Sequence, residues 1–226
     1  MKLVLFDIDG TIMDFPQEHK DAFAEAFRKV YGIDTDINII NPMGMTEQQI
    51  IIEVLRKKGV DDRIIKSKIL EAMHAMTKYF EREMRSGGVK VLAGAEELIK
   101  ELDKNKVLVG VVTGNLEKIA RRKLKEAGLS DYIKLGGFGS DHISRSELVK
   151  LAIKKAEKNF GFEHGKNVYS IGDAPSDMKA GIEGGAFRCI GITTGVHSEG
   201  QLREAGADFI FKNLLEKEKI LKIILE

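Results

Sequence analysis

Short apolar segments that end in polar or glycine-rich turns recur along the chain. They occur at residues 2–6, 107–112, 133–135, 168–171, 188–192 and 208–211. Segments of this length and composition predict β-strands, and most of the intervening segments carry apolar residues at helical spacing, as at Leu116, Ile119, Ala120 and Leu124. The segment 107–112 is apolar throughout, which is typical of a parallel strand covered by helices on both faces. The alternation therefore predicts an α/β fold with a doubly wound parallel sheet.

Residues 15–86 interrupt this alternation with helical patterns and no convincing strand. Thr46 to Gln49 form a capping box that opens one of the expected helices. The apolar stripes of two others are Ala22, Phe23, Ala26, Phe27 and Val30, and Ile64, Ile65, Ile69, Met73, Met76 and Phe80. Met73, Met76 and Met84 are expected to pack in the same helical core. We therefore predict a core domain formed by residues 1–14 and 87–226, with an inserted α-helical domain at residues 15–86 between hinge-prone segments.

The composition excludes several classes of protein. Hydrophobic residues make up 43% and charged residues 31% of the 226 positions, which is typical of a globular chain. The formal net charge of +1 gives no overall attraction to nucleic acid or to an anionic membrane. Cys189 is the single cysteine, which excludes an internal disulfide. The apolar start of the chain is too short for a signal peptide, so we expect a cytoplasmic protein whose partner is a small molecule.

Two pairs of carboxylates follow predicted strands. Asp7 and Asp9 end the first apolar segment, and Asp173 and Asp177 follow the segment 168–171. Ligands bind at the carboxyl ends of the strands in sheets of this kind. One carboxylate of the first pair could attack phosphorus while the other exchanges a proton with the leaving oxygen and then with water. Hard oxygen ligands suit Mg²⁺, which Asp7, Asp173 and a backbone carbonyl would hold.

The strand at 107–112 ends in Thr113, Gly114 and Asn115, which supply a hydroxyl and backbone N–H groups able to cradle a phosphate. Arg145, at the start of a later predicted helix, is the candidate cation for the transferring group. Lys150 is the competing candidate.

With these motifs in this order, the chain resembles the phosphatases of the haloacid dehalogenase superfamily that carry an inserted helical cap, including phosphoglycolate phosphatases. The resemblance implies a Rossmann-like core, Asp7 as nucleophile, and Asp9 as an acid and base whose carbonyl also binds Mg²⁺. It further implies that Thr113 binds phosphate, that Asp173 binds the metal, and that Asp177 orients water or the cation. Gly10, Thr11, Gly114, Asn115 and Arg145 complete the expected substrate site. The family usually has a lysine followed by proline where this chain has Arg145 and Ser146.

The leading hypothesis is a Mg²⁺-dependent phosphomonoester hydrolase that acts on a small phosphorylated metabolite, such as a phosphoglycolate-like compound or a sugar phosphate, through an aspartyl-phosphate. A phosphomutase of the β-phosphoglucomutase type remains an alternative, because His19 could face a substrate. A histidine on a helix surface is the simpler expectation for His19. A non-catalytic phosphate-binding domain is the third alternative, and Asp177 could serve only as a helix cap. The sequence leaves the oligomeric state, monomer or homodimer, open.

Overall fold

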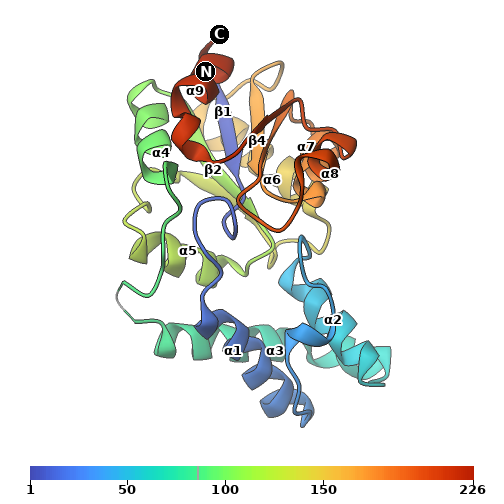
Figure 1. Ribbon diagram of the computed structural model, residues 1–226. Helices are drawn as coiled ribbons and strands as arrows, with labels where there is room; N and C mark the ends of the chain where they lie inside the picture. Colours follow the sequence, from blue (N-terminus) through green and yellow to red (C-terminus); the bar gives the residue numbers. More distant parts are fainter. Residues whose placement is uncertain (86) are drawn as a thin grey trace.

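A computed structural model of the chain describes residues 1–85 and 87–226, and its centre is a parallel sheet (Figure 1). The strand order is β3-β2-β1-β4-β5-β6, and all neighbours are parallel. The strands are β1 (Leu3–Phe6), β2 (Leu108–Thr113), β3 (Leu135–Phe138), β4 (Val168–Gly172), β5 (Arg188–Ile192) and β6 (Phe209–Phe211). The doubly wound sheet predicted from the sequence is confirmed.

Helices cover both faces of the sheet because successive side chains of each strand point to opposite sides. Val4 and Phe6 of β1 pack in a cluster with α4 (Ala95–Lys104), α5 (Glu117–Glu126) and α9 (Lys217–Leu225). Leu3 and Leu5 pack in a second cluster, with α6 (Arg145–Phe160) and α7 (Pro175–Gly184). The short helix α8 (Glu199–Glu204) packs against α7 and β5, and a 3₁₀ turn (Leu214–Glu216) precedes α9. Every residue of β1 and β2 is buried, as expected for strands that helices cover on both faces.

The third strand lies further along the chain than the predicted segment 133–135 and shares only Leu135 with it, so the predicted bounds were wrong. Gly136 and Gly137 resemble a turn in the sequence, yet they lie within β3. A Cβ added to Gly137 would lie 2.1 Å from the carbonyl oxygen of Leu148 in α6. Glycine is therefore placed here so that the helix backbone can approach the strand.

The inserted region is helical, as predicted. It contains α1 (Gln17–Ala26), a π-helical turn (Phe27–Tyr31), a short 3₁₀ turn (Ile37–Ile39), α2 (Glu47–Lys57) and α3 (Asp62–Glu83). Its buried side chains form a core of their own, which Leu116, just before α5, and Ile119 of α5 join. The three methionines belong to this core, as expected. Ile64 does not, because it faces solvent with 48% of its surface exposed.

The capping box at the start of α2 is confirmed, because Thr46 accepts from the N–H of Gln49 and the Gln49 side chain accepts from the N–H of Thr46. In Figure 1 the helices α1, α2 and α3 lie beyond one end of the sheet, joined to it by the segment after β1 and the segment before α4. The predicted boundary at Ser86 lies outside the described residues, and the division at 14/15 and 86/87 stays a prediction. None of the helices in residues 1–85 and 87–226 has the length and hydrophobicity that a membrane span requires.

Candidate active site

Three neighbouring strands deliver polar side chains to one edge of the sheet. Asp7 follows β1, Thr113 ends β2, and Asp173 follows β4. Strand β1 lies between β2 and β4 in register, with Phe6 opposite both Val111 and Ile171. The carboxyl ends of parallel strands meet at one edge, and ligands of such sheets bind there.

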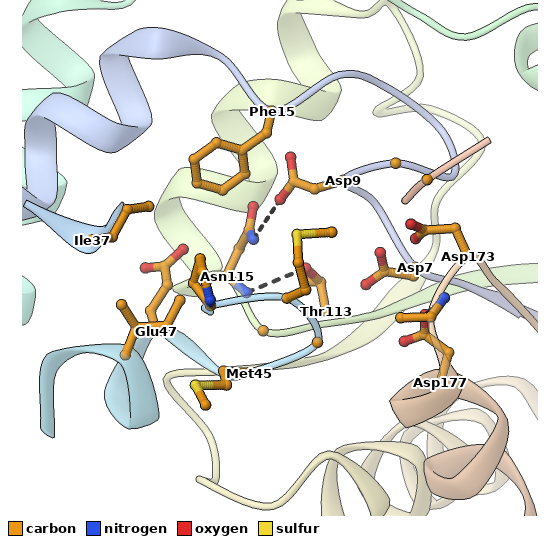
Figure 2. Close-up of a pocket in the computed structure, with 18 of the residues that line it drawn as sticks. Asp7, Asp9, Phe15, Ile37, Met45, Glu47, Thr113, Asn115, Asp173 and Asp177 are labelled. Carbon is orange, nitrogen blue, oxygen red and sulfur yellow. Dashed lines mark hydrogen bonds between the residues drawn. The ribbon is translucent and has the colours of Figure 1, made fainter. Parts of the chain in front are cut away.

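The carboxylates of Asp7, Asp173 and Asp177 form a compact buried group (Figure 2). One carboxylate oxygen from each lies within 4.8 Å of the others, and each residue is at most 8% exposed. Asp177 also caps α7, because its Oδ2 accepts from the N–H of Ala174 at 3.0 Å. Asp177 is therefore a helix cap and also a member of the acidic cluster, while its expected role in orienting water or the cation stays a prediction.

Arg145 brings a buried guanidinium to this acidic cluster from the first position of α6. Its Nη2 donates to Asp7 Oδ1 at 2.8 Å and also contacts Asp177 Oδ1. Lys150, the competing cation of the sequence analysis, is half-exposed and pairs with Glu147 at 2.7 Å on the same helix. Of the two cations, Arg145 is the one that contacts the carboxylates.

The acidic cluster makes ionisation costly. Burial raises the pKa of Asp7 well above its usual range, and the nearby charge of Asp177 adds to the effect. Burial likewise raises the pKa of Asp173 to about 7, again reinforced by Asp177. Like charges that converge in a buried site disfavour one another unless a cation compensates them. When all three carboxyl groups are ionised, one guanidinium faces three carboxylates and the cluster has an excess of negative charge.

The donor set fits a hard divalent cation. Asp173 Oδ1 accepts a hydrogen bond from the Thr11 hydroxyl at 3.2 Å, but Asp173 Oδ2 is buried without a hydrogen-bond partner. A buried carboxylate oxygen left without a partner is costly unless a ligand satisfies it. Gly10, with φ +85°, allows the close approach: a Cβ there would lie 2.6 Å from Asp173 Oδ2. Carboxylate oxygens in this arrangement suit Mg²⁺.

Asp9 faces away from the acidic cluster, toward Asn115 (Figure 2). Asn115 Nδ2 donates to Asp9 Oδ2 at 2.8 Å, and the Asn115 backbone N–H donates to Thr113 Oγ1 at 3.2 Å. The third member of this group is Lys123 of α5, which was not predicted from the sequence, and its Nζ lies 2.6 Å from Asp9 Oδ1. A signal was present, because Lys123 falls on the apolar stripe of its helix, where a charged side chain is unusual.

A cavity of about 350 Å³ opens above these side chains, between the sheet edge and the helical region. Its floor includes Asp7, Asp9, Thr113 and Arg145. On the opposite side it is lined largely by apolar side chains, with a few polar ones. These are Phe15, Ile37, Met43, Met45 and Ile50, together with Lys20, Asn38 and Glu47.

The helical region is hydrogen-bonded to the core at this cavity. The N–H of Glu47 donates to the carbonyl of Gly114 at 2.9 Å, and the Thr46 hydroxyl donates to the carbonyl of Ile143 at 3.2 Å. A Cβ on Gly114 would lie 2.4 Å from the carbonyl oxygen of Met45. The segment before α2 therefore rests directly on the turn after β2.

The expectation that His19 lies on a helix surface was wrong. His19 is fully buried, stacks on Phe15 at 4.5 Å between ring centres, and places its Nε2 2.7 Å from Glu47 Oε1. Burial lowers the pKa of His19 well below its usual value and raises the pKa of Glu47 to about 8. Both shifts favour the uncharged forms of the two side chains. The buried pair therefore carries no net charge near neutral pH.

Known proteins are similar to this chain over most of its length. The sequence model described as Haloacid dehalogenase-like hydrolase matches residues 4–190. The chain is 25% identical over 219 residues to validoxylamine A 7'-phosphate phosphatase of Streptomyces hygroscopicus subsp. limoneus, covering 95% of each chain. It is 26% identical over 227 residues to N-acetylmuramic acid 6-phosphate phosphatase of Pseudomonas putida, covering 98% of this chain and 96% of the relative.

A hydrolase from Pseudomonas syringae has the same fold, with a TM-score of 0.73, 24% identity and 99% coverage of both chains. The α/β fold with helical insertion and the phosphatase class predicted from the sequence are confirmed. The strand ends that carry Asp7, Thr113 and Asp173 all lie inside the matched region. This chain belongs to the haloacid dehalogenase-like hydrolase family.

Proposed function

We propose that this phosphatase hydrolyses phosphomonoesters of small metabolites in two steps, with Asp7 as nucleophile and Mg²⁺ as cofactor. The observation that carries the proposal is the convergence of three buried carboxylates and one guanidinium on the floor of a cavity. A nucleophilic carboxylate in this position needs its charge offset before it can approach a phosphate dianion. Arg145 supplies one positive charge.

The metal would be held by Asp7, Asp173 and the backbone carbonyl of Asp9. Bound Mg²⁺ neutralises the charge of the carboxylates and of the phosphoryl oxygens and orients them for in-line attack. The unpartnered Oδ2 of Asp173 is the strongest support for this placement.

In the first step a carboxylate oxygen of Asp7 forms a bond to phosphorus while the bond from phosphorus to the ester oxygen breaks. Asp9 gives its proton to that oxygen, and the alcohol leaves. In the second step Asp9 takes a proton from water as the water attacks phosphorus, which releases inorganic phosphate and restores Asp7. The hydroxyl of Thr113, the backbone N–H groups of its turn and the guanidinium of Arg145 bind the phosphoryl oxygens.

The other residues expected at the substrate site have partners in the protein. The Thr11 hydroxyl is fully buried and bonds Asp173, and the Asn115 amide bonds Asp9. We propose that these two orient the carboxylates and that Gly10 and Gly114 provide space for the backbone. Asp177 holds Arg145 in place and caps α7.

The size of the cavity supports a small substrate. Its volume of about 350 Å³ lies at the lower end of the range for small-molecule sites. The relatives described above are named as phosphatases of validoxylamine A 7'-phosphate and of N-acetylmuramic acid 6-phosphate. We therefore propose a small phosphorylated metabolite, either phosphoglycolate-like or a sugar phosphate, as the substrate.

A panel of phosphate esters assayed with Mg²⁺ for release of inorganic phosphate tests the proposal. The wild type is expected to turn over at least one ester of a small alcohol, and Asp7→Asn is expected to lose turnover, because an amide cannot form the aspartyl-phosphate. Retained turnover in Asp7→Asn would refute the mechanism. Binding of esters without turnover by the wild type, followed by titration calorimetry, would instead identify a phosphate-binding domain.

The phosphomutase alternative loses its sequence argument, because His19 is buried and does not line the cavity. Incubation with glucose 1-phosphate and a bisphosphate activator separates the two reactions. The hydrolase releases inorganic phosphate and a mutase forms glucose 6-phosphate.

A further inference from the structure

Lys123 is a buried lysine that lies outside every motif of the sequence analysis. It projects from the middle of α5, and none of its side chain is exposed to solvent. Lysine is almost never fully buried unless its charge is paired. Its surroundings therefore indicate what it does.

All three ammonium donors of Lys123 are used, and they serve only two side chains. Nζ donates to Asp9 Oδ1 at 2.6 Å, to Asp9 Oδ2 at 2.9 Å and to Asn115 Oδ1 at 2.8 Å. Asn115 in turn donates to Asp9 Oδ2 at 2.8 Å, which closes a triangle of hydrogen bonds. The carboxylate of Asp9 is thus held through both of its oxygens.

The helical region completes the enclosure of the ammonium. The ring of Phe15 lies over Nζ, 4.9 Å from its centre, and Phe15 also stacks on His19 of the buried pair with Glu47. Phe15 and Asp9 both line the cavity, and the Asp9 side chain is 16% exposed. Lys123 is therefore held by the core and covered by the helical region, at the point where Asp9 faces the ligand cavity.

Stability does not account for this arrangement. Removing two charged groups from water costs several kcal/mol per ion, and an apolar replacement of a buried ion pair is often neutral or stabilising. A fixed orientation of an acid or base, by contrast, contributes strongly to a proton transfer, because the donor must reach the reacting oxygen without searching for it.

We propose that Lys123 is a positioning residue for Asp9, which it holds with Asn115 in the orientation required to protonate the leaving oxygen. The proposal rests on the acid and base role of Asp9 given above. When Asp9 carries its proton on one oxygen, the other oxygen remains an acceptor for Lys123, so the contact persists as the proton moves to the ester oxygen and the bond from that oxygen to phosphorus breaks.

The test compares two leaving groups in Lys123→Met, a variant of similar length without the ammonium. An alkyl phosphate needs a proton on its leaving oxygen, whereas p-nitrophenyl phosphate releases a stable anion without one. The ratio kcat/KM reports the steps up to departure of the leaving group. We expect kcat/KM for the alkyl phosphate to fall about 100-fold or more, within the range for general acid catalysis, and that for p-nitrophenyl phosphate to fall less than about 10-fold.

The matched control is Lys125→Met, an exposed lysine of the same helix, which is expected to leave both ratios within about twofold of the wild type. An equal loss for both substrates in Lys123→Met would show a purely structural role and overturn the proposal. Unchanged or faster turnover of the alkyl phosphate would overturn it too, because Lys123 would then not hold Asp9 in a productive orientation. If Lys123→Met does not fold, Lys123→Gln is subjected to the same comparison.

Asp9→Asn separates this proposal from the proposed function. If Asp9→Asn shows the selective loss and adding Lys123→Met causes no further selective loss, both stand, because the two residues act as a unit. If Asp9→Asn shows the selective loss and Lys123→Met does not, only the positioning role fails. If Asp9→Asn loses both substrates equally, the acid role of Asp9 fails first.

Discussion

Asp173→Asn should stabilise the metal-free protein at high pH while it weakens metal binding. Burial and the neighbouring charge of Asp177 raise the pKa of Asp173 to about 7, from an ordinary value of 3.8. Between these two values the folded chain keeps a proton that the unfolded chain has lost. Stability is therefore lost as the pH rises from about 4 to above 7.

The size of the effect follows from that difference. About three pH units correspond to about 4 kcal/mol of unfolding free energy once Asp173 is fully ionised. Asparagine removes this cost and keeps an oxygen for the Thr11 hydroxyl, but its amide donors have no partner where Oδ2 lies. An unsatisfied buried donor costs about 1–3 kcal/mol. The net expectation for Asp173→Asn in EDTA is a gain of about 1–3 kcal/mol at pH 8.5. At pH 4.5 the wild type has already lost about 1 kcal/mol, so the variant is expected to be less stable by no more than about 2 kcal/mol.

Urea unfolding followed by circular dichroism, at 25 °C with EDTA, measures this difference. The pH dependence of the wild type also contains the raised pKa of Asp7, which the charge of Asp173 helps to raise, so the difference between wild type and variant reports Asp173 together with its effect on Asp7. Asp103→Asn, at an exposed position at the end of α4, is the matched control and should follow the wild type at both pH values. Adding Mg²⁺ at about 100 times its dissociation constant should stabilise the wild type by about 3 kcal/mol and Asp173→Asn by much less. If the unfolding free energy of Asp173→Asn falls with rising pH as steeply as that of the wild type, the surroundings do not raise the pKa of Asp173. That result would refute the reasoning.

Two further changes test the cation and the contact with the helical region. Arg145→Met is expected to lower kcat about 100-fold to 1,000-fold, as for loss of one charge-stabilising donor, while Lys150→Met stays within about twofold in the same phosphate-release assay. Equal effects of the two substitutions would contradict the assignment of Arg145. Gly114→Ala places a Cβ 2.4 Å from the carbonyl oxygen of Met45 and should displace the segment before α2, lowering kcat/KM about 10-fold, in line with 1–3 kcal/mol for overpacking. Gly165→Ala, where the nearest atom would be 3.9 Å away, should leave kcat/KM unchanged, and an unchanged Gly114→Ala would show that this contact does not shape the site.

The sequence by itself determined the sheet, its covering on both faces, and the edge at which the site lies. Apolar segments followed by Asp7, Thr113 and Asp173 suffice for this, because the order of strands and helices fixes where parallel strands end. The capping box at Thr46 was equally readable, since both of its hydrogen bonds are local. Arg145 could be named because it begins a helix directly after a strand and a short loop.

Only the tertiary structure decided what the remaining polar residues do. Lys123 lies 114 positions from Asp9, and His19 lies 28 positions from Glu47, so no local pattern identifies either partner, although the apolar stripe marks Lys123 as unusual. Gly137 reads as a turn until α6 is seen to approach it. Whether a charged side chain is buried, and what it pairs with, depends on which surfaces meet in the folded protein. This is a property of the packing between distant segments, and the spacing of residues along one segment does not record it.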